Sequence, residues 1–342
     1  MIELIIFSLF NLTAILMSNY CIKKKILLNQ SGEKHQQFVE KSQVPLIGGI
    51  YFLVSFIYIL DSLNNYFLIL FAGSIFLVGL YSDLNLIRSP KKRFFIQCII
   101  VLFFIYFLEL KIISTRVEFL DKILDFKIFN LLFILFCLTV LINGTNFIDG
   151  LNGLVIGYYL ILTFIMLRLN FFENLNFSIF EISIIINTFF MMFFMNLKKI
   201  LFLGDSGSYL MGLIFGILLI SHQQNFSTVS PYFVVLLFWY PCFENLFSII
   251  RKFNFKRSPI KPDNEHLHQV LFFYIKKKFS LSDLISNNLS TIIVLLFTFL
   301  TLYLGSLDIY STKLQLYLIL IFSIVYFISY IKLISFKKNF LK

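Results

Sequence analysis

Long apolar runs recur from one end of this chain to the other, and they constrain its fold more than any other feature. A helix needs about 20 apolar residues to cross the hydrocarbon core of a bilayer. Eleven apolar runs are separated by charged or turn residues, namely 2–22, 44–60, 65–82, 94–110, 128–143, 151–169, 179–197, 206–221, 230–250, 287–305 and 313–335. The sequence therefore predicts an all-α polytopic membrane protein with about eleven transmembrane helices.

The composition supports a membrane protein and excludes several other classes. Hydrophobic residues make up 59% of the chain and charged residues only 14%, against roughly 25% charged residues in soluble globular proteins. A chain this apolar is not disordered, collagenous, a coiled coil or a small disulfide-rich secreted domain. The first run follows no basic segment and has no small-residue cleavage site, so we expect a retained helix there. We expect residues 1–342 to form a single integral-membrane domain.

The positions of Lys and Arg predict the orientation of the chain in the membrane. With eleven spans and an outside N-terminus, 23 of the 29 basic residues fall on the cytoplasmic side and 6 do not. Cytoplasmic loops carry an excess of Lys and Arg, so we expect the N-terminus outside and the C-terminus in the cytoplasm. The net charge of +11 is then mainly a consequence of topology, and we expect no nucleic-acid partner.

The segment from Asn143 to Leu154 is the most unusual one on the predicted cytoplasmic side. Three Asn, one Asp and three Gly lie within its twelve residues at the membrane boundary. Polar groups at this depth are costly unless they bind something, and an Asn amide can both donate to and accept from a base or a sugar. Asn143, Asn146, Asp149 and Asn152 are therefore candidate nucleotide contacts. The alternative is a helix–turn–helix with Asn and Asp caps.

A second segment, Gly204 to Ser208, directly precedes an apolar helix. A helix N-terminus attracts anions through its free N–H groups and the positive end of its dipole. A carboxylate repels a phosphate unless a cation lies between them, and Mg²⁺ takes one or two carboxylates together with phosphate oxygens. Asp205 in this position therefore predicts a seat for Mg²⁺ and a pyrophosphate. The alternative is that Asp205 and Ser206 only cap the helix.

A third segment is Ser82-Asp83, which is followed by the basic cluster 89–93. Its simplest interpretation is a capping Asp with a basic loop that reflects topology. Lys34 and His35 lie in the loop that precedes Val44 to Gly49. They are either ordinary loop residues or, for Lys34, a substrate contact.

The longest predicted cytoplasmic loop contains Arg251, His266 and His268. His-X-His is compatible with Zn²⁺, but no thiolate lies near to complete such a site. Contacts from the imidazoles and the arginine to a sugar or a phosphate are the favoured interpretation.

The order of these segments resembles that of the polyprenyl-phosphate N-acetylhexosaminyl-1-phosphate transferases, the WecA/MraY-like family (glycosyltransferase family 4). The family pattern runs Val/Ile-Pro-X-X-Gly-Gly, Asp-Asp, Asn-X-X-Asn-X-X-Asp-Gly-X-Asp-Gly-Leu, Gly-Asp-X-Gly-Ser and a His-rich loop. The matching stretches are Val44–Gly49, Ser82-Asp83, Asn143–Leu154, Gly204–Ser208 and His266–Gln269, within a family-like core of about 30–275. The loop Pro262–Gln269 resembles the WecA-type branch. Ser82, Asn152 and Gln269 depart from the pattern, where the family has Asp, Asp and His.

The resemblance implies the reaction and its partners. It implies a UDP-N-acetylhexosamine donor, such as UDP-GlcNAc, an undecaprenyl phosphate acceptor, and Mg²⁺ as cofactor with Mn²⁺ as a substitute. The products would be undecaprenyl-diphosphate-sugar and UMP, the first step of O-antigen or cell-wall polysaccharide synthesis. The enzyme would lie in the bacterial cytoplasmic (inner) membrane with its active site on the cytoplasmic face, and a homodimer is compatible with this arrangement.

The resemblance also assigns roles to particular residues. The catalytic aspartates would be Asp83, Asp149 and Asp205, with Asp205 as the metal ligand and Asp149 as a second one. The substrate-binding residues would be Lys34, Asn143, Asn146, Asn152, Gly204, Ser208, Arg251, His266 and His268. Direct attack by the lipid phosphate and a two-step route through an aspartyl intermediate both stay open. The alternatives are a MraY-type phospho-N-acetylmuramoyl-pentapeptide transferase and, in another class, a lipid or sugar transporter.

Overall fold

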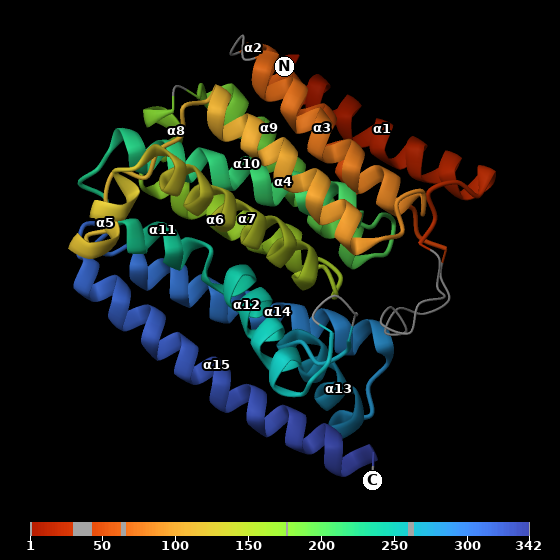
Figure 1. The fold of residues 1–342 in the computed structure, drawn as a ribbon. Helices are drawn as coiled ribbons and strands as arrows, with labels where there is room; N and C mark the ends of the chain where they lie inside the picture. The colour runs from red at the N-terminus through yellow and green to blue at the C-terminus, as the bar shows by residue number, and fades with distance from the viewer. Residues whose placement is uncertain (1, 30–42, 63–65, 176, 259–262, 342) are drawn as a thin grey trace.

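Helices form the part of the chain that the computed structural model describes, which is residues 2–29, 43–62, 66–175, 177–258 and 263–341 (Figure 1). No strand is present among these residues beyond an isolated bridge between Leu28 and Pro45. The helices are α1 (Ile2–Lys24), α2 (Gly48–Ser62), α3 (Tyr66–Asp83), α4 (Pro90–Phe107), α5 (Glu118–Leu124), α6 (Lys127–Ile148), α7 (Leu154–Arg168), α8 (Phe171–Asn174), α9 (Ile179–Leu197), α10 (Gly204–Asn225), α11 (Pro231–Leu237), α12 (Trp239–Asn254), α13 (Leu267–Phe279), α14 (Asp283–Gly305) and α15 (Thr312–Leu341).

Several of these helices are long and apolar enough to cross a membrane. Among the described residues, six meet both conditions, and they are α3, α6, α9, α10, α14 and α15. The pair α11 and α12 counts as a seventh if its 76° bend lies within one broken span. The predicted all-α, multi-pass membrane protein is confirmed.

Two helices have different boundaries from the apolar runs that predict them. The run 128–143 continues as α6 to Ile148, so Asn143 and Asn146 lie on a helix and not in the connecting turn. A helix accommodates these amides because both bond to groups on other helices or on the preceding turn. The predicted run 206–221 begins two residues earlier, at Gly204, so Asp205 lies in the first turn of α10.

Helix α10 lies in the centre of the bundle, with α15 along one side and α1 along the other (Figure 1). It packs against α2, α3 and α6, and small residues allow their backbones to approach closely. A Cβ on Gly49 of α2 would lie 2.5 Å from the backbone nitrogen of Gly207. A Cβ on Gly79 of α3 would collide with the backbone of Ser206. The N-terminal turn of α10 is thus held directly against two neighbouring helices.

The chain entering α10 is also tied to the chain entering α2. Phe202 donates its N–H to the carbonyl of Pro45 at 2.8 Å, and Gly48 donates back to the carbonyl of Phe202 at 2.9 Å. These bonds satisfy backbone groups that no helix can satisfy. The Val44–Gly49 stretch therefore positions the start of α10.

Candidate active site

The N-terminus of α10 is capped by an aspartate from another helix. Asp83, the last residue of α3, accepts the backbone N–H of Asp205 at 2.8 Å and that of Ser206 at 3.1 Å. Gly204 has φ +75°, and a Cβ there would lie 2.7 Å from the Asp83 carboxylate. A carboxylate at a helix N-terminus is favourable because it satisfies free donors and opposes the positive dipole end. In this structure, the Asp83 carboxylate therefore occupies these two N–H groups at the start of α10.

Asp205 points into a group of donors from three other helix segments. Its Oδ2 accepts from the Ser82 hydroxyl at 2.6 Å and pairs with Arg93 Nη1 at 2.5 Å. Its Oδ1 accepts from the Asn146 amide at 2.7 Å. The side chains of Arg93 and Asp205 remain 22% and 25% exposed, so this ion pair is open to exchange with an incoming ligand.

The two asparagines of α6 line this group one turn apart. Asn146 donates to the Ser208 hydroxyl at 3.1 Å as well as to Asp205. Asn143 donates to the side-chain carbonyl of Gln97 at 3.2 Å. Their i, i+3 spacing places both amides on one face of the helix. The structure therefore brings the predicted Asn146 and Ser208 together with Asp205, while Asn143 lies one turn earlier with Gln97 as its partner.

Asp149 ends α6 and begins the turn to α7. It is half-buried. Burial, and then the negative charges of Asp205 and Asp83, raise the pKa of Asp149 well above its usual value. Like charges in a low-dielectric site oppose one another's ionisation. Asp83, Asp149 and Asp205, the three predicted catalytic aspartates, thus influence one another's charge in the structure.

Asn152 lies in the same turn but its side chain is buried, with 4% exposed. Its backbone N–H donates to the side chain of Asn287 at 2.8 Å, and its carbonyl accepts from Thr291 at 2.8 Å. Its side-chain nitrogen has no partner among the described residues. The predicted substrate contact at Asn152 is therefore turned into the protein in this structure.

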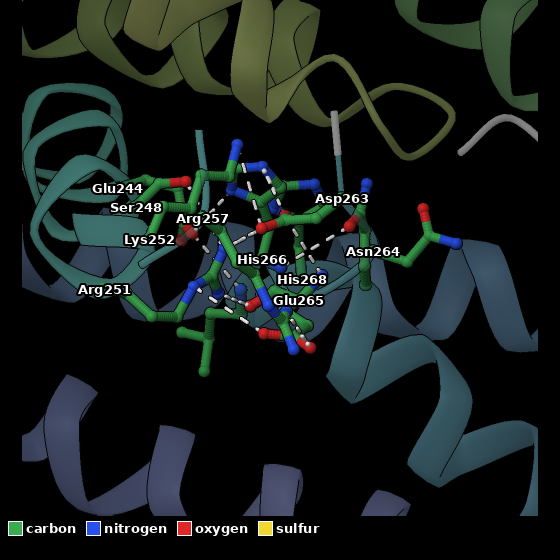
Figure 2. Close-up of polar contacts among 12 residues, drawn as sticks. Glu244, Ser248, Arg251, Lys252, Arg257, Asp263, Asn264, Glu265, His266 and His268 are labelled. Carbon is green, nitrogen blue, oxygen red and sulfur yellow. Dashed lines mark hydrogen bonds and ion pairs between the residues drawn. The ribbon is translucent and has the colours of Figure 1, made fainter. Parts of the chain in front are cut away.

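The second group of predicted residues gathers around Asp263, between α12 and α13 (Figure 2). Arg251 Nη2 bonds both carboxylate oxygens of Asp263, at 3.0 and 2.8 Å. Arg251 Nη1 bonds the hydroxyl of Tyr330 at 2.9 Å and the carbonyl of Glu265. The terminal nitrogens of Arg251, a predicted substrate contact, are thus engaged within the protein.

Further basic side chains surround the same carboxylate. Lys252 Nζ lies 3.7 Å from Asp263, and His266 Nε2 lies 3.6 Å from it. Burial alone would raise the pKa of Asp263. The charges of His266 and Arg251 outweigh it and hold the pKa below its usual value.

Glu244 of α12 anchors the start of α13. It is fully buried, and its Oε1 accepts from His266 Nδ1 at 3.0 Å and from the backbone N–H of Leu267 at 3.3 Å. Its Oε2 accepts from the hydroxyl of Tyr326 at 2.7 Å. A buried carboxylate with three donors is well satisfied, so Glu244 fixes His266 in place.

His268 connects the two groups. It is fully buried, its Nδ1 lies 3.3 Å from the hydroxyl of Tyr240, and a Cβ on Gly150 would lie 2.6 Å from its Nε2. Burial lowers the pKa of His268 to about 3. The neutral imidazole is therefore packed against the turn that carries Asp149.

A metal ion was predicted at Asp205 and Asp149. Within the described ranges, no group of three or more His, Cys, Asp or Glu side chains is arranged to hold a metal. Mg²⁺ needs only one or two protein carboxylates, because it keeps waters and takes phosphate oxygens. The two neighbouring carboxylates fit that donor set.

Some members of the site are not predicted from the sequence, and one predicted residue lies outside the described residues. Lys34 falls within 30–42 and is outside them. Arg93 belongs to the basic cluster that topology explains, and no sequence motif points to Gln97. Ser89 and Pro90 are typical of a helix start. Extending a helix from there would have placed Arg93 and Gln97 on one face, four residues apart.

One family of known proteins matches part of this chain. Residues 65–223 match the sequence pattern of glycosyl transferase family 4. This stretch contains Asp83, Arg93, Asn146, Asp149 and Asp205.

Individual relatives are similar over different parts of the chain. An undecaprenyl-phosphate alpha-N-acetylglucosaminyl 1-phosphate transferase of Thermotoga maritima is 27% identical over 246 residues, 72% of this chain and 74% of the relative. A decaprenyl-phosphate N-acetylglucosaminephosphotransferase of Mycolicibacterium smegmatis is 32% identical over 152 residues, 38% of this chain and 37% of its own length. A phospho-N-acetylmuramoyl-pentapeptide-transferase of Prochlorococcus marinus is 26% identical over 239 residues, which are 62% of this chain and 66% of the relative.

Proposed function

The chain belongs to glycosyl transferase family 4, and from that membership we propose that it transfers N-acetylhexosamine 1-phosphate from a UDP-sugar to undecaprenyl phosphate. An oxygen of the lipid phosphate forms a bond to the sugar-bearing phosphorus of the donor. The bond from that phosphorus to the UMP oxygen breaks, and UMP leaves. The lipid product is undecaprenyl-diphosphate-sugar, and the expected donor is UDP-GlcNAc or a related UDP-N-acetylhexosamine.

The observation that carries the proposal is the open acidic group at the start of α10. Asp205 is a quarter exposed and is bound by Arg93, Ser82 and Asn146. Such a group can exchange its internal bonds for bonds to a phosphate and a cation, whereas a closed network cannot. Phosphoryl transfer depends mainly on positioning and on charge stabilisation, and both are available here.

The chain's own residues have distinct parts in this scheme. Arg93 leaves Asp205 and pairs with a phosphate, because a guanidinium suits phosphate oxygens well. Asn143 and Asn146 orient the nucleotide from α6. Asp205, with Asp149 as a second ligand, would hold Mg²⁺ or Mn²⁺, which supplies neutralisation of the charge that develops on the leaving UMP.

Direct attack by the lipid phosphate is the favoured route. A phosphate monoester is already largely anionic near neutral pH, with a second pKa of about 6, so it needs no strong base. The alternative nucleophile Asp83 has both oxygens bonded to backbone N–H groups of α10. Those bonds stabilise the carboxylate and reduce its reactivity. This arrangement supports Asp83 as the cap of α10 and not as a covalent intermediate.

The proposal includes the membrane topology. Each of the eleven predicted runs falls on α1, α2, α3, α4, α6, α7, α9, α10, the α11–α12 pair, α14 or α15. Asp83, Asp149 and Asp205 lie at the ends of α3, α6 and α10 that meet the basic residues 88–93 and 198–199. We therefore place this end in the cytoplasm of a bacterium, with the N-terminus outside and the C-terminus inside. The product would begin O-antigen or cell-wall polysaccharide synthesis.

The test is release of UMP by the purified protein in detergent with undecaprenyl phosphate and Mg²⁺. Parallel reactions would contain UDP-GlcNAc, UDP-GalNAc, their 6-deoxy relatives and UDP-MurNAc-pentapeptide. We expect UMP only when both the lipid phosphate and a UDP-N-acetylhexosamine are present. Turnover of UDP-MurNAc-pentapeptide alone would favour the muramoyl transferase, and no UMP from any donor would contradict the proposal. The proposal allows a homodimer, which light scattering after size-exclusion chromatography would detect.

A further inference from the structure

The first half of α14 is unusually polar for a helix inside a membrane protein. Ser286, Asn287, Ser290 and Thr291 are all buried, with at most 3% exposed. Polar side chains in this environment are costly unless they bind a partner. Two of them, Asn287 and Thr291, lie one helical turn apart and bind the same residue of a distant turn.

That residue is Asn152, between α6 and α7. Asn287 accepts its N–H at 2.8 Å and Thr291 donates to its carbonyl at 2.8 Å. The next residue, Gly153, has φ +75° and donates its N–H to the side chain of Asn196 at 2.5 Å. Backbone groups of a buried turn have no helical partner, so side chains from elsewhere must satisfy them.

The same turn carries the acidic residue of the site. Asp149 lies three residues before Asn152, and its N–H bonds the carbonyl of Asn146 at 3.2 Å, whose side chain in turn bonds Asp205 at 2.7 Å. Gly150 contacts His268. The position of the Asp149 carboxylate therefore depends on where the turn is held. Among the described residues, three side chains bind the backbone of this turn, and two of them lie on α14.

We propose that Asn287 and Thr291 are positioning residues, which hold the turn 149–153 so that Asp149 faces Asp205. The inference rests on the proposed function for its catalytic consequence. Helix α14 lies outside residues 65–223, so these two side chains extend the catalytic framework to a part of the chain that the family pattern does not cover. Neither residue touches the reacting atoms.

Loss of an anchor should change turnover more than substrate binding. The turn 149–153 would shift slightly, while Arg93 on α4 and Asp205 on α10 stay in place. Misplacement of a reacting group by about 1 Å can cost roughly 100-fold in rate. We expect Thr291→Val to lower kcat about tenfold or more and to leave KM for both substrates nearly unchanged.

Matched variants separate positioning from general damage to the helix. Thr291→Ser keeps the hydroxyl and should retain wild-type kcat. Thr298→Val removes a buried hydroxyl of the same helix that has no partner among the described residues, so it should be silent. Asn287→Ala should match Thr291→Val, and its control is Asn288→Ala, whose side-chain oxygen also has no partner there.

A second measurement does not depend on turnover. Hydrogen exchange followed by mass spectrometry reports the protection of amides in the turn 149–153. We expect faster exchange there in Thr291→Val and Asn287→Ala, and wild-type exchange in Thr291→Ser and in both controls.

The outcomes distinguish this inference from the proposed function. Slower turnover with faster exchange, rescued by Thr291→Ser, supports the inference. Equal kcat in Thr291→Val and Thr298→Val, or slower turnover without a change in exchange, overturns it. If the wild-type protein releases no UMP, the proposed function fails, and unchanged exchange in both variants would overturn the anchoring independently. If Thr291→Val does not elute as a monodisperse peak, Asn287→Ala provides the same test.

Discussion

Asp205 and Asp263 each pair with an arginine, and the two pairs differ in almost everything that surrounds them. The Arg93–Asp205 pair is a single contact at 2.5 Å between side chains that are 22% and 25% exposed. In the Arg251–Asp263 pair, one guanidinium nitrogen bonds both carboxylate oxygens, and the side chains are only 4% and 15% exposed. The first pair can open to admit a ligand, whereas opening the second would leave a charge buried without a partner.

The charged groups around Asp205 and around Asp263 also differ. Around Asp205, two further carboxyl groups are present, and burial and the charges of Asp205 and Asp83 raise the pKa of Asp149, while Arg93 is the cation that pairs with Asp205. Around Asp263, Arg251 and Lys252 both pair with the carboxylate, so its charge is compensated within the protein. The carboxyl groups around Asp205 favour the binding of a cation. The satisfied, buried network around Asp263 holds protein segments together. The difference indicates that the first region performs the chemistry and the second builds the frame.

The largest expected effect is on stability, from Arg251→Ala. Removing one partner of a buried ion pair leaves the other unpaired, which costs about 3–5 kcal/mol. We expect that loss in the free energy of unfolding, measured in mixed detergent micelles. Arg257→Ala is the control, because its pair with Glu265 at 3.2 Å is exposed and such pairs contribute about 0–1 kcal/mol. A loss below about 1 kcal/mol for Arg251→Ala would contradict the structural role.

The next largest effect is on catalysis, from Asp205→Ala. Loss of one preorganised electrostatic contact to the transition state costs roughly 100- to 1,000-fold in kcat. We expect UMP release to fall by at least about 100-fold while the protein keeps its melting temperature within a few degrees. Retention of more than about a tenth of the wild-type rate would contradict Asp205 as the metal ligand, because metal charge stabilisation contributes several kcal/mol.

Arg93→Ala should have a smaller effect on the same assay. Asp205 keeps its bonds from Ser82 and Asn146, so the carboxylate stays in place and only the cation is lost. We expect kcat/KM to fall about tenfold, which corresponds to about 1.4 kcal/mol. Lys92→Ala is the matched control, since Lys92 is exposed on the same helix. Equal rates for the two variants would show that Arg93 has no role in turnover.

The smallest effect concerns His268, which lies where the two regions meet. Its pKa is about 3 in the folded protein against an ordinary value of 6.5. Below pH 6.5 the unfolded chain therefore binds a proton that the folded protein does not, and stability falls by at most about 1.4 kcal/mol per pH unit. We expect about 1 kcal/mol less stability at pH 5.5 than at pH 7. His268→Gln should remove that difference, and an unchanged pH dependence would contradict the buried neutral state.

The helices and the acidic group were predictable from the sequence because their signals are local. Long apolar runs predict helices without knowledge of their neighbours. Asp83, Asp149 and Asp205 stand out because carboxylates are rare at the membrane boundary. Periodicity and composition do not indicate which helices contact one another.

Contacts between distant segments account for what was missed. The pairing of Arg93 with Asp205 joins residues 112 positions apart, and Arg93 also fits a basic loop that reflects topology. The anchoring of Asn152 by Asn287 spans 135 positions. Asn152 was expected to contact substrate because its residue type suits a nucleotide, but its surroundings turn the side chain inward.

The glycine contacts around the start of α10 have a consequence for how accurately the site is built. Gly49 and Gly79 bring α2 and α3 against the backbone of α10 at Gly207 and Ser206, and Asp83 is only four residues beyond Gly79. Backbones in contact have no rotamers to exchange, so no side chain between them can repack and alter their spacing. The distance from α3 to the first turn of α10 therefore acts as a fixed length. In random mutagenesis, Gly49 and Gly79 should tolerate substitution almost as poorly as Asp83, Asp149 and Asp205.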